Sequence, residues 1–213
     1  MHDIAIIGGG PGGYVCAIRA AQNGLSVALV EKGQLGGVCL NRGCIPTKTL
    51  AHTADVMDEA SRAAELGLII PEVRLDFARV MARKDKVIAK LRGGVGLLLR
   101  RRKVDVFSGV GTLAGTRAVE ATASDGSTAR IEARNIVIAT GSEPIAPRMF
   151  GYDGVNMLTS DDVLKLKELP ESMLVVGAGV IGCEFASIFR TFGCDVTMVD
   201  IMPNILPMVD EDV

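Results

Sequence analysis

The spacing of hydrophobic residues predicts the same strand–helix–strand unit at both ends of the chain. Short apolar runs at residues 4–7 and 174–176 have the length of buried strands. Each is followed by a glycine-rich turn and then by apolar residues at helical spacing, up to a closing glycine. Second apolar strands follow at residues 27–30 and 196–199. An α/β fold with a parallel sheet is therefore expected.

The two units align on each other without a gap. The matched glycines are Gly8 with Gly177, Gly10 with Gly179, and Gly13 with Gly182. In such a turn the first glycine permits the bend, the second lets the backbone approach a pyrophosphate, and the third lets the helix pack on the strand. Glu31 and Asp200 end the second strands at the same spacing from the last glycine, where a carboxylate can bind a ribose. We therefore expect two Rossmann-like dinucleotide-binding units with doubly wound parallel sheets, and Asp200 favours NAD over NADP.

The chain between the repeats is less regular. Apolar spacing predicts a helix over residues 51–66 and a long helix over 77–103, interrupted by the glycines at 93–96. Alternating apolar and polar residues predict a hairpin of strands 118–123 and 128–133. A further buried strand is expected at residues 136–139.

A boundary between two domains is expected near residue 150. The connection there is rich in proline and glycine, at Pro144, Pro147, Gly151 and Gly154. A short helix over 161–169, capped by Thr159 or Ser160 and ended by Pro170, follows it. The domains are then 1–150, with the hairpin inserted, and 151–213, an incomplete domain holding the second unit.

Composition narrows the class of protein. The 213 residues are 48% hydrophobic and 23% charged, as in globular proteins, and the 25 glycines exceed the usual share of about 7%, which suits phosphate-binding loops. The net charge of −2 gives no reason to expect a nucleic acid or a membrane surface as partner, and the basic run 100–103 is interpreted as a solvated helix end. We see no apolar run of membrane-spanning length and no basic leader, so a cytoplasmic location is expected.

Two cysteines lie directly after the first repeat. Cys39 and Cys44 are separated by four residues among glycines, close enough in sequence for a disulfide. Pro46 favours the first turn of a helix, which places Cys44 at its positive end and Lys48 one turn further on. Both effects favour a thiolate. A zinc site would need two more ligands at matching spacing, so we expect a redox pair and no metal, with an inert pair as the alternative.

These features together resemble a known family. Residues 36–48, the two glycine-rich loops and Ala139-Thr140-Gly141 are similar to the flavin-dependent pyridine nucleotide-disulfide oxidoreductases, and most similar to the branch that oxidises dihydrolipoamide with NAD. The resemblance runs along the whole chain. It implies the cofactors FAD and NAD.

The resemblance also implies roles for individual residues. Cys39 would exchange with the substrate's sulfur, and Cys44 would lie against the flavin as the charge-transfer thiolate. Lys48 would approach the flavin and pair with Glu184. Gly115, after a turn at 109–111, would contact the adenine end. The implied FAD site is Gly8, Gly10, Pro11, Gly12, Gly13, Glu31, Lys32, Gly36, Gly37, Val38, Cys39, Lys48, Gly115, Ala139, Thr140, Gly141 and Ser142. The implied NAD site is Gly177, Gly179, Val180, Ile181, Gly182, Glu184 and Asp200.

Members of the family are about twice as long, which implies that this chain corresponds to their N-terminal half. The segment that supplies the dimerisation domain and its histidine base lies beyond it, so we expect the 213 residues alone to be inactive. The parent enzyme would be a homodimer acting on a lipoyl-bearing protein or a small disulfide. The alternatives are a glutathione or mercuric-type reductase, and a noncatalytic redox or nucleotide-binding fragment.

Overall fold

A computed structural model describes residues 1–146 and 148–210; Pro147 of the expected connection and the last three residues lie outside that part. The chain forms two compact units, Met1–Ile45 with Val87–Ile145, and Pro46–Lys86 with Ala146–Val213. The predicted α/β class is confirmed in both. The chain crosses between the units close to the expected boundary, but residues 46–86 group with the second unit, and the assignment of domains by function stays a prediction.

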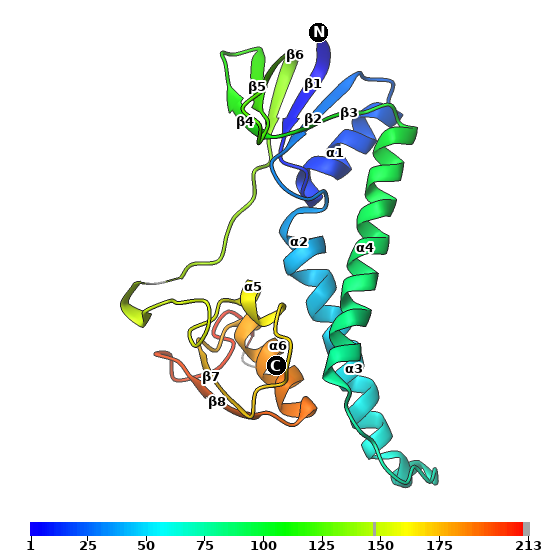
Figure 1. The fold of residues 1–213 in the computed structure, drawn as a ribbon, viewed down its shortest axis with the longest axis vertical. Coiled ribbons are helices and arrows are strands. Elements are labelled where there is room, and N and C mark those ends of the chain that lie inside the picture. Colours follow the sequence, from blue (N-terminus) through cyan, green and yellow to red (C-terminus); the bar gives the residue numbers. More distant parts are fainter. Residues whose placement is uncertain (147, 211–213) are drawn as a thin grey trace. The chain divides into compact units, whose positions relative to one another are not determined.

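The first unit is built on a parallel sheet (Figure 1). Its parallel strands are β1 (His2–Ile7), β2 (Val27–Glu31), β3 (Asp105–Ser108) and the second half of β6 (Thr128–Ile138). Helix α1 (Pro11–Gln22) connects β1 to β2 as the repeat predicts. The full sheet has the order β3-β2-β1-β6-β5-β4, and β3 has no counterpart in the expected elements.

An antiparallel layer continues from this sheet. Strands β4 (Val110–Leu113) and β5 (Ala118–Thr122) pair with each other, and β5 pairs with the first half of β6, which confirms the hairpin. The separate strand expected at 136–139 is wrong, because β6 runs on without a break. Its Glu132 pairs with β5 and its Ala133 already pairs with β1, so one strand serves both layers.

The turn expected at residues 109–111 is also wrong beyond its first residue. Val110 and Gly111 belong to β4. A Cβ atom on Gly111 would lie 2.9 Å from a methyl group of Ile7 and 3.2 Å from one of Val30. This glycine therefore allows β4 to pack closely on β1 and β2. In the sequence, a glycine needed for such packing looks the same as a glycine needed for a turn.

Strands β1 and β2 are buried on both faces, which explains their uninterrupted apolar runs. On one face Ile6 and Leu29 join a core with Leu99 of helix α4 (Phe77–Arg101) and with α1. On the other face, alternate residues pack against the antiparallel layer. These are Ala5, Ile7, Ala28 and Val30, against Val119, Ala121, Ile131 and Ala133.

Helix α4 is continuous, so the predicted interruption at residues 93–96 is wrong. Each glycine inside a helix costs about 0.5–1 kcal/mol relative to alanine. Val95 and Leu99 are buried in the core of the first unit, and their burial offsets that cost. The packing of this face thus overrides the local preference of the glycines.

A short helix, α2 (Gly37–Arg42), precedes α3 (Cys44–Ser61), and the single turn η1 (Ala63–Leu66) follows it. The predicted helix over 51–66 therefore begins seven residues too late. Apolar spacing alone gives this later start, whereas Pro46 correctly predicts a helix start beside Cys44.

The second repeat forms a small parallel sheet in the second unit. It consists of β7 (Ser172–Val176), α6 (Val180–Phe192) and β8 (Asp195–Val199), as predicted. Phe185, Phe189 and Phe192 of α6 cluster with Phe77, with neighbouring ring centroids 6.2–6.4 Å apart. The opposite face of the two strands is open: Leu174 is 61% exposed.

The helix that precedes this sheet is shorter than predicted. Residues Arg148–Phe150 form the single turn η2, and α5 covers Ser160–Val163 instead of 161–169. Thr159 caps α5, and its N–H and hydroxyl both donate hydrogen bonds to the Asp162 carboxylate. The buried Lys84 of α4 donates a hydrogen bond to the carbonyl of Leu164, the residue that follows α5. Among the residues that the structure describes, no helix is both long and apolar enough to cross a membrane.

Gly13→Ala should destabilise the first unit by about 3 kcal/mol or more, because the added Cβ would overlap the Gly8 carbonyl. Gly93→Ala is the matched control. A Cβ there meets no described atom within 4 Å, and the change should stabilise by about 0.5–1 kcal/mol. Urea unfolding followed by circular dichroism measures both, and equal effects would contradict this account of the turn.

Candidate functional site

The first glycine-rich loop joins β1 to α1. Gly8 has φ +108°, and a Cβ there would overlap the carbonyl of Ala139. A Cβ on Gly13 would overlap the carbonyl of Gly8. Gly10 caps α1, and its Cβ position is 3.6 Å from the nearest atom. The outer glycines thus fix the backbone, while the middle one leaves room at the helix start.

The second loop, between β7 and α6, repeats this arrangement. Gly177 has φ +110°, and a Cβ on Gly182 would overlap the Gly177 carbonyl. Gly179 caps α6, and no described atom lies within 4 Å of its Cβ position. Val180, Ile181 and Gly182 form the first turn of the helix. The bend at the first glycine and the close helix packing at the third are therefore as expected in both repeats, while the approach of a pyrophosphate to the second stays a prediction.

Both predicted carboxylates face their own loop. The Oε2 atom of Glu31, at the end of β2, accepts a hydrogen bond of 2.5 Å from the Gly9 N–H. The Oδ2 atom of Asp200, directly after β8, accepts one of 2.5 Å from the Ala178 N–H. The second oxygen of each accepts a backbone N–H two residues further on, at 2.7 Å from Gly33 and 2.7 Å from Met202. The expectation that each lies on the ligand side of its sheet is confirmed.

These bonds set the charge of Asp200. The backbone N–H groups of Ala178 and then Met202 hold the pKa of its carboxyl below the ordinary value. Each carboxylate oxygen has a lone pair beyond the backbone bond, which can accept a bond from a ribose hydroxyl. With a helix start that has space beside it, both loops fit the ribose and pyrophosphate of a dinucleotide.

The strand next to the first loop closes over it. Ala139 follows β6 and donates a hydrogen bond of 2.8 Å to the Ile7 carbonyl. Thr140, Gly141 and Ser142 continue from there, and Glu143 lies 3.4 Å from the Lys32 ammonium. Both charges are largely exposed, so this pair contributes only about 0–1 kcal/mol. Lys32 is thereby tied to the segment that borders the loop.

Gly115 is not brought to the loop by any described contact. It lies in the turn between β4 and β5 with φ +124°, a conformation that favours glycine. Its predicted contact with an adenine stays a prediction.

The dithiol motif spans the helices α2 and α3, and α3 begins at Cys44, the second cysteine of the motif. Cys39 is half-buried in α2, and Cys44 is exposed as the first residue of α3. The position of Cys44 at a helix start is therefore as expected, while the pairing of the two sulfurs stays a prediction. Burial raises the pKa of the Cys194 thiol, which lies in the core of the second unit.

Lys48 and Glu184 are in contact, although they are far apart in sequence. Lys48 lies one turn into α3 and Glu184 one turn into α6, and both belong to the second unit. The Lys48 ammonium donates a hydrogen bond to Oε1 of Glu184. Lys48 is 64% exposed and Glu184 24% exposed. The predicted ion pair is confirmed, and its place beside a flavin stays a prediction.

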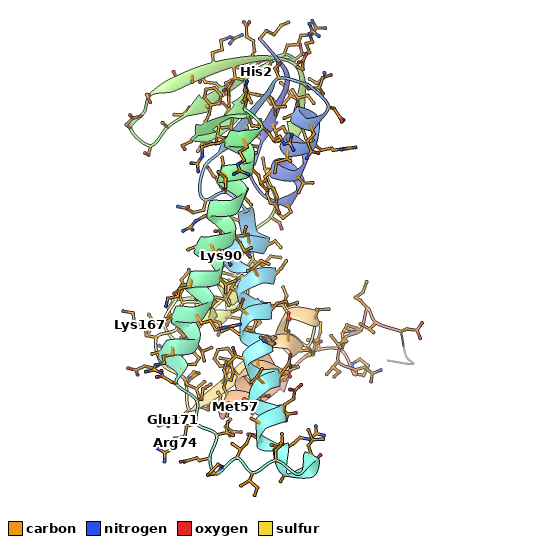
Figure 2. All side chains as sticks on the ribbon, turned by 90° about the vertical axis from the view of Figure 1, so that its right-hand side faces the viewer. His2, Met57, Arg74, Lys90, Lys167 and Glu171 are labelled. Atoms are coloured by element: carbon orange, nitrogen blue, oxygen red, sulfur yellow. The ribbon has the colours of Figure 1, made fainter. Side chains whose placement is uncertain are left out.

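A shallow cavity of about 250 Å³ lies elsewhere, lined by Met1, His2, Phe107, Arg130, Ile131 and Glu132. His2 is labelled at the start of β1 in Figure 2. Parallel sheets bind ligands at the carboxyl ends of their strands, where Gly8 and Glu31 lie. The cavity at the start of β1 is therefore not part of the dinucleotide site.

The comparison with known proteins agrees with this geometry. The model of the pyridine nucleotide-disulphide oxidoreductase family matches residues 2–213. The chain belongs to this family. It is 45% identical over 213 residues to a dihydrolipoyl dehydrogenase of Chlorobaculum parvum, covering all of this chain and 45% of that protein. A dihydrolipoyl dehydrogenase of Acholeplasma laidlawii is 42% identical over 217 residues, with 63% of its length covered.

Solved structures of family members share the fold. The crystal structure of LpdA from Mycobacterium tuberculosis matches with a TM-score of 0.92 and 31% identity, over 100% of this chain and 47% of that one. The Cu(II) complex of the flavoprotein disulfide reductase RclA from Escherichia coli matches with a TM-score of 0.83 and 33% identity. The match covers 99% of this chain and 45% of that one. The chain spans about half the length of most of these relatives.

Some residues at the site were not singled out from the sequence. Gly9 donates the bond that orients Glu31, and Asn41 binds the loop before α2 as well as Arg92 of α4. The run of three glycines at 8–10 could have pointed to Gly9. Asn41 stands inside the dithiol motif, but its partners are backbone carbonyls, which sequence patterns do not reveal.

Asp200→Asn should lower stability at neutral pH, because the amide cannot accept both backbone bonds as a carboxylate does. The folded-state pKa of Asp200 is lowered, so its contribution is present above the unfolded-state pKa and is lost as pH falls through the lowered value. The difference between wild type and variant should therefore vanish in strong acid. Urea unfolding at several pH values measures it, with exposed Asp195→Asn as control. A difference that persists in strong acid would refute the linkage.

Proposed function

We propose that this chain is the cofactor-binding and dithiol-bearing part of a dihydrolipoyl dehydrogenase, which oxidises dihydrolipoamide and reduces NAD. One observation carries the proposal: the dithiol segment is attached directly to a dinucleotide loop. The Gly36 N–H donates a hydrogen bond of 2.8 Å to the Gly9 carbonyl, and α2 with Cys39 begins at the next residue. Thiols held beside a dinucleotide loop are suited to exchange electrons with a bound redox cofactor.

The family supports FAD as the cofactor of the first loop. The residues at the start of α1 would receive its pyrophosphate, and Glu31 would bind the ribose of its adenosine half. FAD supplies two-electron chemistry between a dithiol and a nicotinamide. The chain's own contribution is to hold the cofactor and to present Cys39 and Cys44 to it.

NAD is proposed for the second loop. The ionised Asp200 carboxylate suits a ribose diol and disfavours the 2′-phosphate of NADP. Glu184, on the first turn of α6, neutralises the Lys48 ammonium and restrains it at the helix start. This pair would keep a positive charge positioned near the reacting ring without a buried unpaired ion.

The dithiol exchange balances in atoms and electrons. The Cys39–Cys44 disulfide accepts two electrons and two protons in total from dihydrolipoamide, which becomes the cyclic disulfide. Cys39 forms the mixed disulfide with the substrate, and Cys44 leaves as a thiolate. The positive end of α3 stabilises that thiolate, because Cys44 is the first residue of the helix. FAD, held by the first loop and Glu31, would supply the two-electron transfer from the dithiol to the nicotinamide.

The partner in this proposal is a lipoyl-bearing protein, and the complete enzyme is a homodimer in the cytoplasm. A reductase for glutathione or mercuric ion, with the same dithiol chemistry, is the alternative within the family. A noncatalytic redox fragment is the alternative outside it. These differ in the substrate that turns over, so a substrate panel separates them.

The full-length protein that contains this chain should reduce NAD with dihydrolipoamide and should accept glutathione disulfide or mercuric ion at least about tenfold less well in kcat/KM. Steady-state absorbance of NADH measures this. Cys39→Ser should abolish turnover and keep FAD bound, because it removes only the exchanging sulfur. Equal rates with glutathione would favour the alternative reductase, and no turnover with any substrate would favour the fragment.

Glu184→Gln in the same protein should slow hydride transfer by up to about fivefold, since Lys48 is 64% exposed and such an ion pair contributes about 0–1 kcal/mol. FAD binding should be unchanged. Stopped-flow reduction by NADH measures the rate. Glu168→Gln, an exposed glutamate of the same unit, is the matched control. If both variants react at the wild-type rate, the ion pair has no part in the reaction.

A further inference from the structure

The side chain of Asn41, inside the dithiol motif, bonds to the loop before α2, to α2 itself and to α4. Its Nδ2 atom lies 2.9 Å from the Gly37 carbonyl oxygen and 3.1 Å from that of Leu35, with a longer contact of 3.4 Å to Gln34. Its Oδ1 atom accepts a bond of 3.4 Å from the Arg92 guanidinium. A single half-buried side chain thus links the loop, α2 and α4.

The loop that Asn41 holds is the one attached to the dinucleotide loop. Gly36 donates its N–H to the Gly9 carbonyl at 2.8 Å. A Cβ on Gly37 would lie 2.5 Å from the Gly10 Cα, so the start of α2 rests on the glycine that caps α1. Contacts that hold residues 34–37 in place therefore also hold α2 against the first glycine-rich loop.

Helix α4 supports this loop from the other side. Arg92 and Gly96 are four residues apart and lie on one face of α4. The Cβ position of Gly96 is 3.9 Å from Leu35 Cδ1, and Leu35 packs against the core that contains Val95 and Leu99. Leu35 therefore lies in van der Waals range of α4 beside Gly96, while Arg92 reaches Asn41.

We propose that Asn41, supported by Arg92, is a positioning residue that fixes the dithiol helix α2 against the dinucleotide loop; the proposal rests on the function proposed above. Helix α2 has only six residues, and a helix of this length has little stability of its own. Its position depends on bonds to its surroundings. Between Cys39 and Cys44 in the chain, Asn41 donates one N–H to the Leu35 carbonyl in the loop and one to the Gly37 carbonyl at the start of α2. The alignment of the two sulfurs should therefore depend on this amide.

The 213-residue chain allows a test that needs no cofactor. In glutathione buffers, the two thiols give two electrons and two protons to glutathione disulfide, which becomes two glutathione molecules, and the Cys39–Cys44 disulfide forms. Alkylation and peptide mass spectrometry measure the equilibrium constant. Asn41→Ala should lower this constant about tenfold, which is a shift of about 30 mV for two electrons, because the sulfurs are held together less well. A role confined to global stability would leave this potential unchanged.

Asn135→Ala is the matched control, since its Nδ2 atom also donates to a backbone carbonyl, that of Asp3 at 3.2 Å, but at the start of β1. It should leave the constant within about twofold of wild type. Asn41→Asp keeps the size of the side chain and loses both donors, so it should shift the constant in the same direction as Asn41→Ala even if the latter folds poorly. Arg92→Met should give a smaller shift of the same sign.

The outcomes separate this proposal from the function on which it rests. A wild-type chain that forms the Cys39–Cys44 disulfide, with Asn41→Ala and Asn41→Asp both equal to Asn135→Ala, would overturn the positioning role alone. A wild-type chain that forms no such disulfide at any glutathione ratio would contradict the proposed function, and this proposal with it.

Discussion

The close approach of a helix to the strand before it, permitted by a pair of glycines in each repeat, is the constraint on which both sites depend. Gly13 lies on the carbonyl of Gly8, and Gly182 on that of Gly177, at separations that leave no space for a side chain. The helix can therefore begin directly above the end of the strand. Its first N–H groups then open onto the same edge of the sheet as the next strand's terminal carboxylate. The anion site and the ribose site are thus two results of one packing contact.

Much of this could be predicted from sequence because it depends on local spacing. The repeat, its glycines, Glu31 and Asp200 lie within one strand–helix–strand unit, where distance along the chain fixes distance in space. The ion pair of Lys48 and Glu184 was predicted from family resemblance together with helix positions, and it forms in the second unit. The cysteines were singled out by their motif, which shows their chemistry but not the bonds that hold their helix.

The errors have a common physical origin in long-range packing. Local propensity predicts a break at the glycines of α4, yet Val95 and Leu99 on one face of that helix are buried in the core. The short apolar strands β3 and β4 were missed because they are recognisable only beside β2 and β1. Likewise, the residue that follows α5 is bonded to Lys84, which lies 80 residues away in the chain. In each case the residue that makes the contact is far away in sequence, beyond the short segments over which the spacing of hydrophobic residues can be analysed.

The open face of β7 and β8 has a thermodynamic consequence. Leu174, Val176 and Val199 already meet water in the native state of the second unit. The heat capacity of a protein rises on unfolding chiefly because apolar groups become hydrated, by about 12–15 cal/mol/K per residue in ordinary globular domains. Groups that are hydrated beforehand add nothing to that increase. The free energy of unfolding of this unit should accordingly show less curvature with temperature than that of an ordinary domain of the same length.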